Sequence, residues 1–364
     1  MYFQSAETTV IGGGIVGLSV ALGLLQAGRK VTVLDGPDSD QRASQGNFGL
    51  VWLQGKGAAC PAYAHWTSSA VSAWPALSEQ LADITGIDVQ LAQSGGYEFF
   101  TDAAEFDTYA EDLNRQKTAL GPDLPIELLT SGELRQRLPA IGPKVAGATY
   151  CARDGHVNPL LLLRALRIAV QRLGGKMINR TTIEGIEHAP GGGFILTGRR
   201  GFRQGTGRLV LCAGLGAMTL APQLGFRTRV RPQRGELLIT EKLGGALPFL
   251  SSTIRQVNEG GIQIGGTKAE AGLDDSDTLD NTARLARHAV DVLPALAGVR
   301  VLRSWGALRV MTGDGYPVYA QSADQPGAYL VTCHSGVTLA PNHAGALVKW
   351  MDGAAGAPNL EAFD

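Results

Sequence analysis

The hydrophobic pattern at the start of the chain predicts a strand, then a helix, then a second strand. Threonine and β-branched residues at 8–11 predict a buried strand, an apolar run that ends at Gly28 predicts a helix, and Lys30–Leu34 predicts a second strand. A strand, a helix and a strand joined by short turns are typical of an α/β fold with a parallel sheet.

Residues 8–28 are mostly apolar and about long enough to span a membrane as a helix. Six glycines interrupt this stretch, and a strand pattern follows it directly. We therefore interpret it as part of a globular domain and not as a membrane span.

Beyond this unit the pattern predicts helices and strands separated by glycine-rich loops. Asn158 and Pro159 form a typical helix start, as N-cap and first helical residue, and Ser131 is the expected cap of a short helix. The other predicted helices cover 61–81, 103–120, 278–293 and 337–351; predicted strands include two within 89–101 around a Gly95-Gly96 turn and runs that begin near 208, 235, 261, 299 and 328.

Composition narrows the class of protein. The chain has 364 residues, 44% hydrophobic and 18% charged, which fits about two globular domains. The net charge of −1 gives no reason to expect nucleic acid or an anionic membrane as a partner. Four scattered cysteines predict no iron–sulfur or zinc site and favour a reduced, cytoplasmic protein. Residues 1–5, MYFQS, look like the remnant of an expression tag.

Three glycines stand in G-x-G-x-x-G spacing between the first predicted strand and helix: Gly12, Gly14 and Gly17. This spacing allows a tight turn, lets a pyrophosphate approach the backbone, and lets the helix pack closely on the sheet. Asp35 ends the next strand, where an acidic side chain accepts a ribose hydroxyl. We predict one dinucleotide site, because no second G-x-G-x-x-G occurs; this pattern alone also allows NAD.

No linker or repeat marks a domain boundary, so we predict two interleaved domains. The predicted nucleotide-binding domain comprises 6–80, 144–222 and 300–364. The predicted substrate domain comprises 81–143 and 223–299.

An ordered set of motifs extends over essentially the whole chain after Ser5. Besides the glycine unit, it comprises the Ser44–Leu50 loop, His156–Pro159, Leu211–Gly214, Gly235–Leu238, Trp305–Arg309, Asp314–Pro317 and His334–Pro341. In this order the motifs resemble the D-amino-acid oxidase family of FAD enzymes, close to glycine oxidase. The nearest branch is that of D-hydroxyproline dehydrogenase, opine oxidase and the flavoprotein of hydrogen cyanide synthase.

The resemblance implies non-covalent FAD in a Rossmann-like domain of the p-hydroxybenzoate hydroxylase type, interleaved with a substrate domain on a large, mainly antiparallel sheet. It also implies that a helix N-terminus at 336–338 points at the pyrimidine end of the flavin. Ile183 matches an adenine contact, with an ordinary strand residue as the alternative. The implied cofactor residues are Gly12, Gly14, Ile15, Val16, Gly17, Asp35, Gly36, Arg42, Ser44, Asn47, Gly49, Leu50, Ile183, Gly214, Gly336, Val337 and Thr338.

For the substrate, the resemblance implies that Arg309 binds a carboxylate through two parallel N–H bonds. Arg255 suits a second carboxylate or a larger polar group, unless it faces outward from its strand. His334 either contacts flavin or substrate or is an ordinary core histidine. Gln263 stands where sarcosine oxidase-like members carry a lysine that promotes reaction with O₂; Lys56 or Lys268 could substitute for it.

The expected activity is oxidation of a small amino acid or secondary amine with a carboxylate, such as glycine, a D-amino acid, hydroxyproline or an opine. Hydride passes to flavin N5 and the imine hydrolyses. We expect the electrons to go to a partner protein or carrier and not to O₂. The alternatives are an O₂-using oxidase, a flavin electron-transfer subunit without its own substrate oxidation, and a nicotinamide dehydrogenase. The sequence leaves the substrate, its chirality and the oligomeric state open.

Overall fold

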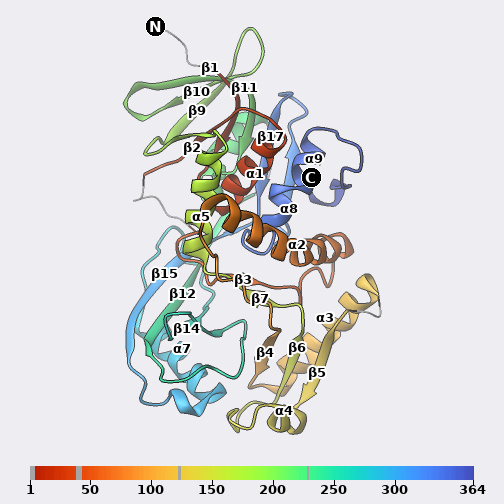
Figure 1. Ribbon diagram of the computed structural model, residues 1–364, viewed down its shortest axis with the longest axis vertical. Helices are drawn as coiled ribbons and strands as arrows, with labels where there is room; N and C mark the ends of the chain where they lie inside the picture. Colours follow the sequence, from red (N-terminus) through yellow and green to blue (C-terminus); the bar gives the residue numbers. More distant parts are fainter. Residues whose placement is uncertain (1–4, 38–42, 122–123, 228) are drawn as a thin grey trace.

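The computed structural model describes residues 5–37, 43–121, 124–227 and 229–364. Its strands fall into two regions, which form the upper and lower halves of Figure 1. The upper region contains a mostly parallel sheet, and the lower region contains antiparallel sheets. This mixed α/β architecture confirms the predicted fold class.

The upper sheet follows the strand order β16-β17-β11-β1-β2-β8 among the described residues, with β9 and β10 paired beside β11. Strands β17, β11, β1, β2 and β8 run parallel, and β16 is an antiparallel edge. The bounds of these strands are β1 Ser5–Ile11, β2 Val31–Leu34, β8 Lys176–Ile178, β9 Ile183–His188, β10 Phe194–Gly198, β11 Phe202–Leu211, β16 Val318–Gln321 and β17 Ala328–Thr332.

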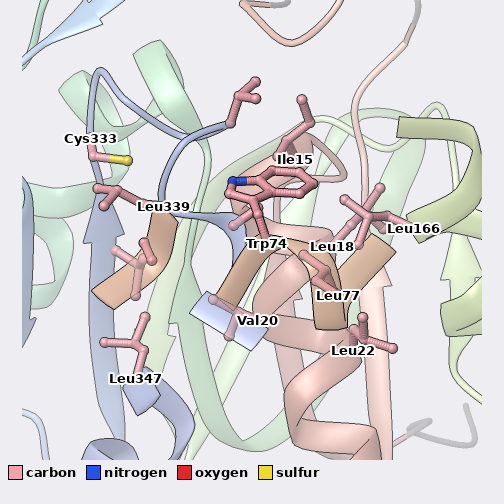
Figure 2. Packing of buried hydrophobic residues seen from close by; sticks show 14 of the residues in the cluster. Ile15, Leu18, Val20, Leu22, Trp74, Leu77, Leu166, Cys333, Leu339 and Leu347 are labelled. Carbon is pink, nitrogen blue, oxygen red and sulfur yellow. The ribbon is translucent and has the colours of Figure 1, made fainter. Parts of the chain in front are cut away.

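The two faces of this sheet bury alternate residues of each strand, as the pleat requires. Val10 faces helices, among them α1, whereas Ile11 faces the β9–β10 ribbon and short helix α6. Figure 2 shows the helical side, where Trp74 lies among Ile15 and Leu18 of α1. This core holds the first turn of α1 rigidly against the end of β1.

The helices nearest the upper sheet include α1 and α5. Asn158 caps α5 as predicted, since its side chain accepts hydrogen bonds from Leu160 N at 3.1 Å and Leu161 N at 3.2 Å. No helix in the described ranges is both long and apolar enough to cross a bilayer. The α-helices are α1 Ile15–Gln26, α2 Pro61–Thr85, α3 Ala103–Leu120, α4 Ser131–Arg137, α5 Pro159–Arg172, α6 Ala217–Leu220, α7 Leu279–Val292, α8 Ala340–Ala344 and α9 Ala346–Met351.

The lower region consists of a four-stranded sheet, β13-β14-β12-β15, and a three-stranded sheet, β4-β6-β5, within the described chain. The two antiparallel sheets meet at an isolated bridge between Tyr97 and Ser251. Small strands β3 and β7 pair near the junction of the two regions. The bounds are β3 Leu50–Val51, β4 Gly96–Phe100, β5 Ile126–Thr130, β6 Gly147–Cys151, β7 Gly155–His156, β12 Arg231–Lys242, β13 Ile254–Gln256, β14 Gly261–Gly265 and β15 Val301–Met311.

Three predicted elements differ from the structure. Only one strand, β4, forms within 89–101, because Ala92 instead bridges to His156. The cap of α4 is Thr130 and not Ser131: Thr130 N donates to Glu133 at 2.8 Å, and the Thr130 hydroxyl accepts from Glu133 N.

The third difference lies in the last predicted helix, 337–351. Gly345, at φ −128° and ψ −85°, interrupts it and separates α8 from α9.

Strands β6 and β15 pair in the lower sheets, although the predicted boundaries place 144–222 and 300–364 with the nucleotide-binding domain.

Candidate active site

The turn between β1 and α1 is built so closely that side chains are excluded. Gly12 has a φ of +115°, and a Cβ there would lie 2.3 Å from the carbonyl oxygen of Cys212. A Cβ on Gly17 would lie 2.0 Å from the carbonyl oxygen of Gly12. Both glycines therefore let the helix start directly over the strand end, as the spacing predicts.

Two side chains close around this turn. Asp35, at the end of β2, accepts a hydrogen bond from Gly13 N at 2.9 Å and pairs with Arg167 at 3.3 Å. Ser44 accepts from Ile15 N at 3.0 Å, at the start of α1. Arg42, the other residue expected here, lies outside the described residues.

A cavity of about 710 Å³ extends from this turn along the edge of the sheet. A cavity of this size beside a helix start fits a dinucleotide, because the glycine turn leaves room for phosphates and Asp35 flanks that turn. The expected residues that line it are Gly12, Gly14, Ile15, Val16, Asp35, Gly36, Ser44, Asn47, Ile183, Gly214, Gly336 and Val337.

Four further expected residues lie beside this cavity without lining it. Gly17 packs α1 on the strand, and Gly49 approaches the Val157 carbonyl so closely that a Cβ would lie 2.3 Å away. Leu50 and Thr338 line a neighbouring cavity instead, and Thr338 Oγ1 donates to the Leu50 carbonyl at 3.0 Å.

The helix start expected at 336–338 needs correction. Residues 336–339 form a turn, and regular helix begins only at Ala340. The backbone N–H groups of 336–338 donate to no other group in the described part of the chain, so three donors remain available at the cavity edge. Trp74 fixes this turn by donating from its indole nitrogen to the Thr338 carbonyl at 3.0 Å.

A second cavity, of about 230 Å³, adjoins the first and lies against the lower region. The two cavities share Asn47, Cys333, His334 and Val337 among their lining residues. The walls of the second cavity come from several parts of the chain. Its lining residues include Phe48, Leu50, Trp52, Lys56, Gly235, Leu237, Ser252, Gly266, Leu308, Arg309, Ser335 and Thr338.

Arg309, on β15, lines this second cavity, and its guanidinium has no acidic partner in the part of the chain that the structure describes. Its Nη1 donates to the carbonyl oxygens of Thr267 at 2.8 Å and Arg234 at 3.3 Å, and no carboxylate in the described ranges pairs with it. A Cβ on Gly235 or Gly266 would lie within 2.9 Å of its guanidinium nitrogens, so glycines make room for it. Burial lowers the pKa of Arg309.

His334 lies between the two cavities. Burial, together with the positive charges of Lys56, Arg309 and Lys268, lowers its pKa to about 3. The imidazole is therefore neutral near pH 7. It therefore adds no charge to the site.

Lys56, a possible substitute for the lysine that Gln263 replaces, lies in the wall of the second cavity. Its Nζ donates to Ser335 Oγ at 3.2 Å, and burial together with Lys268 lowers its pKa. Buried Gln116 fixes the loop by donating to the carbonyl oxygens of Leu53 at 2.8 Å and Lys56 at 2.9 Å. The cavity thus carries two lining cations, Lys56 and Arg309.

Arg255 and Gln263 are cross-strand neighbours on β13 and β14, and neither lines either cavity. Arg255 is 4% exposed; its Nη1 is 3.1 Å from His156 Nδ1, and its guanidinium lies 5.4 Å from the ring of Phe48. Phe48 lines the second cavity, so Arg255 sits behind it. Burial lowers the pKa of Arg255 to about 10.

Glu98 is a site residue that sequence reasoning missed. It accepts a hydrogen bond from Ser252 Oγ at 2.6 Å, and Ser252 lines the second cavity. Burial raises the pKa of Glu98 to about 7. The available signal was a lone acid inside the aromatic strand Gly96–Phe100.

A glycine-built dinucleotide cradle that opens into a smaller, cation-lined cavity defines a nucleotide-dependent enzyme with a separate substrate site. Comparison with known proteins gives the family. Residues 7–350 match the family described as "DAO: FAD dependent oxidoreductase". The chain belongs to this family; it is an oxidoreductase acting on amino acids or amines, and its cofactor is FAD.

Three relatives illustrate the match. The chain is 43% identical to one of the subunits of opine oxidase from Rhizobium meliloti, over 93% of this chain and 91% of that protein. It is 25% identical to glycine oxidase of Bacillus licheniformis, over 92% and 90%. The fold superposes on the crystal structure of glycine oxidase from Geobacillus kaustophilus with a TM-score of 0.88, at 23% identity over 99% and 98% of the two chains.

Proposed function

We propose that this protein oxidises the C–N bond of a small amino acid or secondary amine that carries a carboxylate. The observation that carries the proposal is Arg309, whose half-buried guanidinium lines the second cavity and has no carboxylate partner among the described residues. A guanidinium in this state has its charge available for an anionic ligand. Lys56 adds a second positive charge to the same wall.

The residues of the chain bind the substrate and orient its reacting carbon toward the cofactor. When bound, FAD supplies the acceptor for the hydride that leaves the substrate carbon. Arg309 binds the substrate carboxylate, which fixes the carbon at the junction with the cofactor cavity. Neutral His334 forms a polar wall there without repelling a cationic amine. The imine product then hydrolyses in water.

We propose an opine-like substrate, meaning an N-carboxyalkyl amino acid with two carboxylates. Two observations support this choice: the 43% identity to a protein named as part of opine oxidase, and the second buried arginine, Arg255, behind Phe48. A shift of the Phe48 ring would bring a second carboxylate to Arg255. Glycine, D-amino acids and hydroxyproline remain in the substrate class to be tested.

The test is a screen for anaerobic bleaching of the bound flavin. Purified holoenzyme is mixed without oxygen with glycine, sarcosine, D-proline, hydroxyproline and N-carboxyalkyl amino acids. We expect at least one carboxylated amine to bleach the flavin. Bleaching by none of them, in enzyme whose flavin dithionite still reduces, contradicts the proposal and favours an electron-transfer subunit.

We propose that the electrons pass to a partner protein or carrier and not to O₂. Support comes from the name of the opine oxidase relative, which describes one subunit of a larger enzyme, and from the absence of a metal-binding cluster in the described part of this chain. Lys56 favours the second candidate, an oxidase, because a cation beside the flavin stabilises superoxide as it forms.

Stopped-flow reoxidation of the substrate-reduced enzyme separates the two acceptors. Air-saturated buffer is compared with an artificial dye, in wild type and in Lys56→Met. Dye reoxidation much faster than reaction with O₂ supports the carrier. Equal rates, with the O₂ rate falling in Lys56→Met, identify an oxidase.

We also propose a cytoplasmic location and the division into a cofactor-binding and a substrate-binding part. All four cysteines are free thiols, which suits a reducing compartment.

A further inference from the structure

Glu98 is the one charged residue of β4, and its neighbours Tyr97 and Phe99 turn to the opposite face, where they pack in the lower core. Its side chain is half-buried. It accepts a hydrogen bond from Ser252 Oγ at 2.6 Å, and no lysine or arginine in the described ranges lies within ion-pair distance of it. This carboxylate is therefore held without a counter-ion.

Ser252 joins this carboxylate to the substrate cavity. Ser252 N donates to the Tyr97 carbonyl at 3.2 Å, which fixes the serine beside β4, and Ser252 itself lines the 230 Å³ cavity. Gly265 N donates to the Thr253 carbonyl at 2.9 Å. The adjacent Gly266 borders the Arg309 guanidinium, so the serine and the arginine flank one short backbone segment.

We propose that Ser252 and Glu98 form the amine end of the substrate site. Ser252 accepts a hydrogen bond from the substrate amine, and Glu98, a positioning residue behind it, takes the proton of the substrate ammonium through the serine hydroxyl. This assignment rests on the proposed oxidation of an amine that carries a carboxylate. It gives the cavity two ends, Arg309 for the carboxylate and Ser252 for the nitrogen.

The proton transfer balances without a further reactant. One N–H bond of the ammonium breaks as a new Ser252 O–H bond forms, and the earlier serine proton moves to Glu98 Oε1. The ammonium loses its positive charge, and Glu98 loses its negative charge. The amine gains the lone pair that hydride loss from the neighbouring carbon requires, and the carboxyl later releases its proton to water.

The groups around Glu98 suit a carboxyl that exchanges a proton near neutrality. Burial raises its pKa to about 7, while the Ser252 hydrogen bond and the charges of Lys268 and Lys56 oppose that rise. Asp154 and Tyr109 also interact with it: burial raises the pKa of each, and the charge of Glu98 adds to that rise. A group with a pKa close to the working pH both accepts and returns protons readily.

The experiment measures the pH dependence of anaerobic flavin reduction between pH 5.5 and 9.5 in holoenzyme. Glu98→Gln keeps an acceptor for Ser252 but cannot take the proton, and Glu98→Asp keeps the carboxylate. Exposed Glu127, on β5 of the same sheet, pairs with Arg137 of α4 at 2.7 Å and supplies the control Glu127→Gln.

We expect wild type and Glu127→Gln to show a rate that rises through an apparent pKa near 7, and Glu98→Asp to keep a rising limb because it keeps a carboxylate. In Glu98→Gln this limb disappears, so the rate at pH 7 falls by about 100-fold and recovers toward wild type at pH 9.5, where the free amine is already neutral. A Glu98→Gln profile parallel to wild type, or one lowered equally at every pH, overturns the proposal.

A second readout does not depend on turnover. If no amine reduces the wild-type flavin, the proposed function fails, and infrared difference spectra on adding sarcosine then judge Glu98 directly. A carboxylic C=O band that appears in wild type and is missing in Glu98→Gln supports proton uptake by Glu98. No band in wild type overturns it. Where Glu98→Gln does not retain flavin, the same measurements on Ser252→Ala decide, with the same expected loss.

Discussion

The two adjoining cavities differ in the groups available to a ligand. The larger one contains the β1–α1 turn, where a Cβ on Gly12 would collide with the Cys212 carbonyl, and Asp35 flanks that turn. The smaller one has the charged side chains of Arg309 and Lys56 in its wall and Glu98 one hydrogen bond behind it. At the glycine turn a single added methyl group would clash with backbone, whereas in the smaller cavity a single substitution would change the charge offered to a substrate.

The largest expected effect is the loss of FAD from a glycine variant of the cofactor cavity. In Gly12→Ala the new methyl would lie 2.3 Å from the Cys212 carbonyl, at a φ of +115°. Such strain costs several kcal/mol in total, so we expect protein purified without FAD. The measurement is the flavin released by acid per mole of protein, and from wild type we expect complete release, as for a non-covalently bound cofactor.

Gly28→Ala is the matched control, since Gly28 also has a positive φ, +78°, but its Cβ would meet nothing within 4 Å. It should lose about 1 kcal/mol of stability and keep its FAD. Equal FAD loss in both variants would contradict the role given to the backbone of the turn.

The next largest effect is a fall in kcat/KM for the substrate in a variant that still binds FAD. Arg309→Lys removes a guanidinium that can bind a carboxylate through two parallel N–H bonds, and a single ammonium cannot replace it. The transition state should therefore lose about 2–4 kcal/mol of stabilisation, and kcat/KM should fall roughly 30- to 1,000-fold. The flavin spectrum should stay normal. Arg303→Lys, exposed on the same strand, is the control and should change kcat/KM by less than about threefold. Similar values for both variants would remove Arg309 from the substrate site.

The difference between the cavities also explains what the sequence predicts. The glycine turn and Asp35 lie within one strand–helix–strand unit, so their spacing alone specifies their geometry. Asn158 and Pro159 likewise specify a helix start through local hydrogen bonds. Local chemistry therefore predicts the cofactor half well.

The substrate half depends on contacts between distant segments. Glu98 and Ser252 are 154 residues apart, and Lys56 reaches Ser335 across 279 residues. No periodicity in one strand reveals a partner in another sheet, so the sequence does not predict Glu98 and Ser252 as site residues or the contact of Lys56 with Ser335. The last helix starts later than the sequence predicts for a related reason: Trp74, on α2, donates to the Thr338 carbonyl within the turn at 336–339.

A smaller effect should appear in the pH dependence of stability. Asp154 is fully buried, with its carboxylate bonded to Leu53 N at 2.5 Å and Gln54 Nε2 at 2.7 Å, and burial raises its pKa to about 7. The folded state therefore binds its proton more tightly than the unfolded state. Its contribution to stability is present below pH 4 and falls by about 1.4 kcal/mol per pH unit up to pH 7.

Asp154→Asn lacks this titration. The free energy of unfolding of wild type minus that of the variant should fall between pH 5 and pH 7, as measured by denaturant titration. Parallel curves for the two proteins would show that Asp154 does not titrate in this range.

The smallest effect is expected at Gln263, which lies outside both cavities. Gln263→Met should leave the rate of anaerobic flavin reduction within about twofold of wild type, because a side chain outside both cavities does not contact the substrate. A drop beyond tenfold would show that the substrate cavity extends to β14.

The most direct test of the account compares each amine with its decarboxylated analogue, such as sarcosine with dimethylamine and proline with pyrrolidine. The measured quantity is the second-order rate constant for anaerobic flavin reduction. We predict that the carboxylated member reacts about 30- to 1,000-fold faster in wild type, and that Arg309→Lys removes most of this difference. Equal rates for both members of each pair would contradict the claim that Arg309 selects a carboxylate.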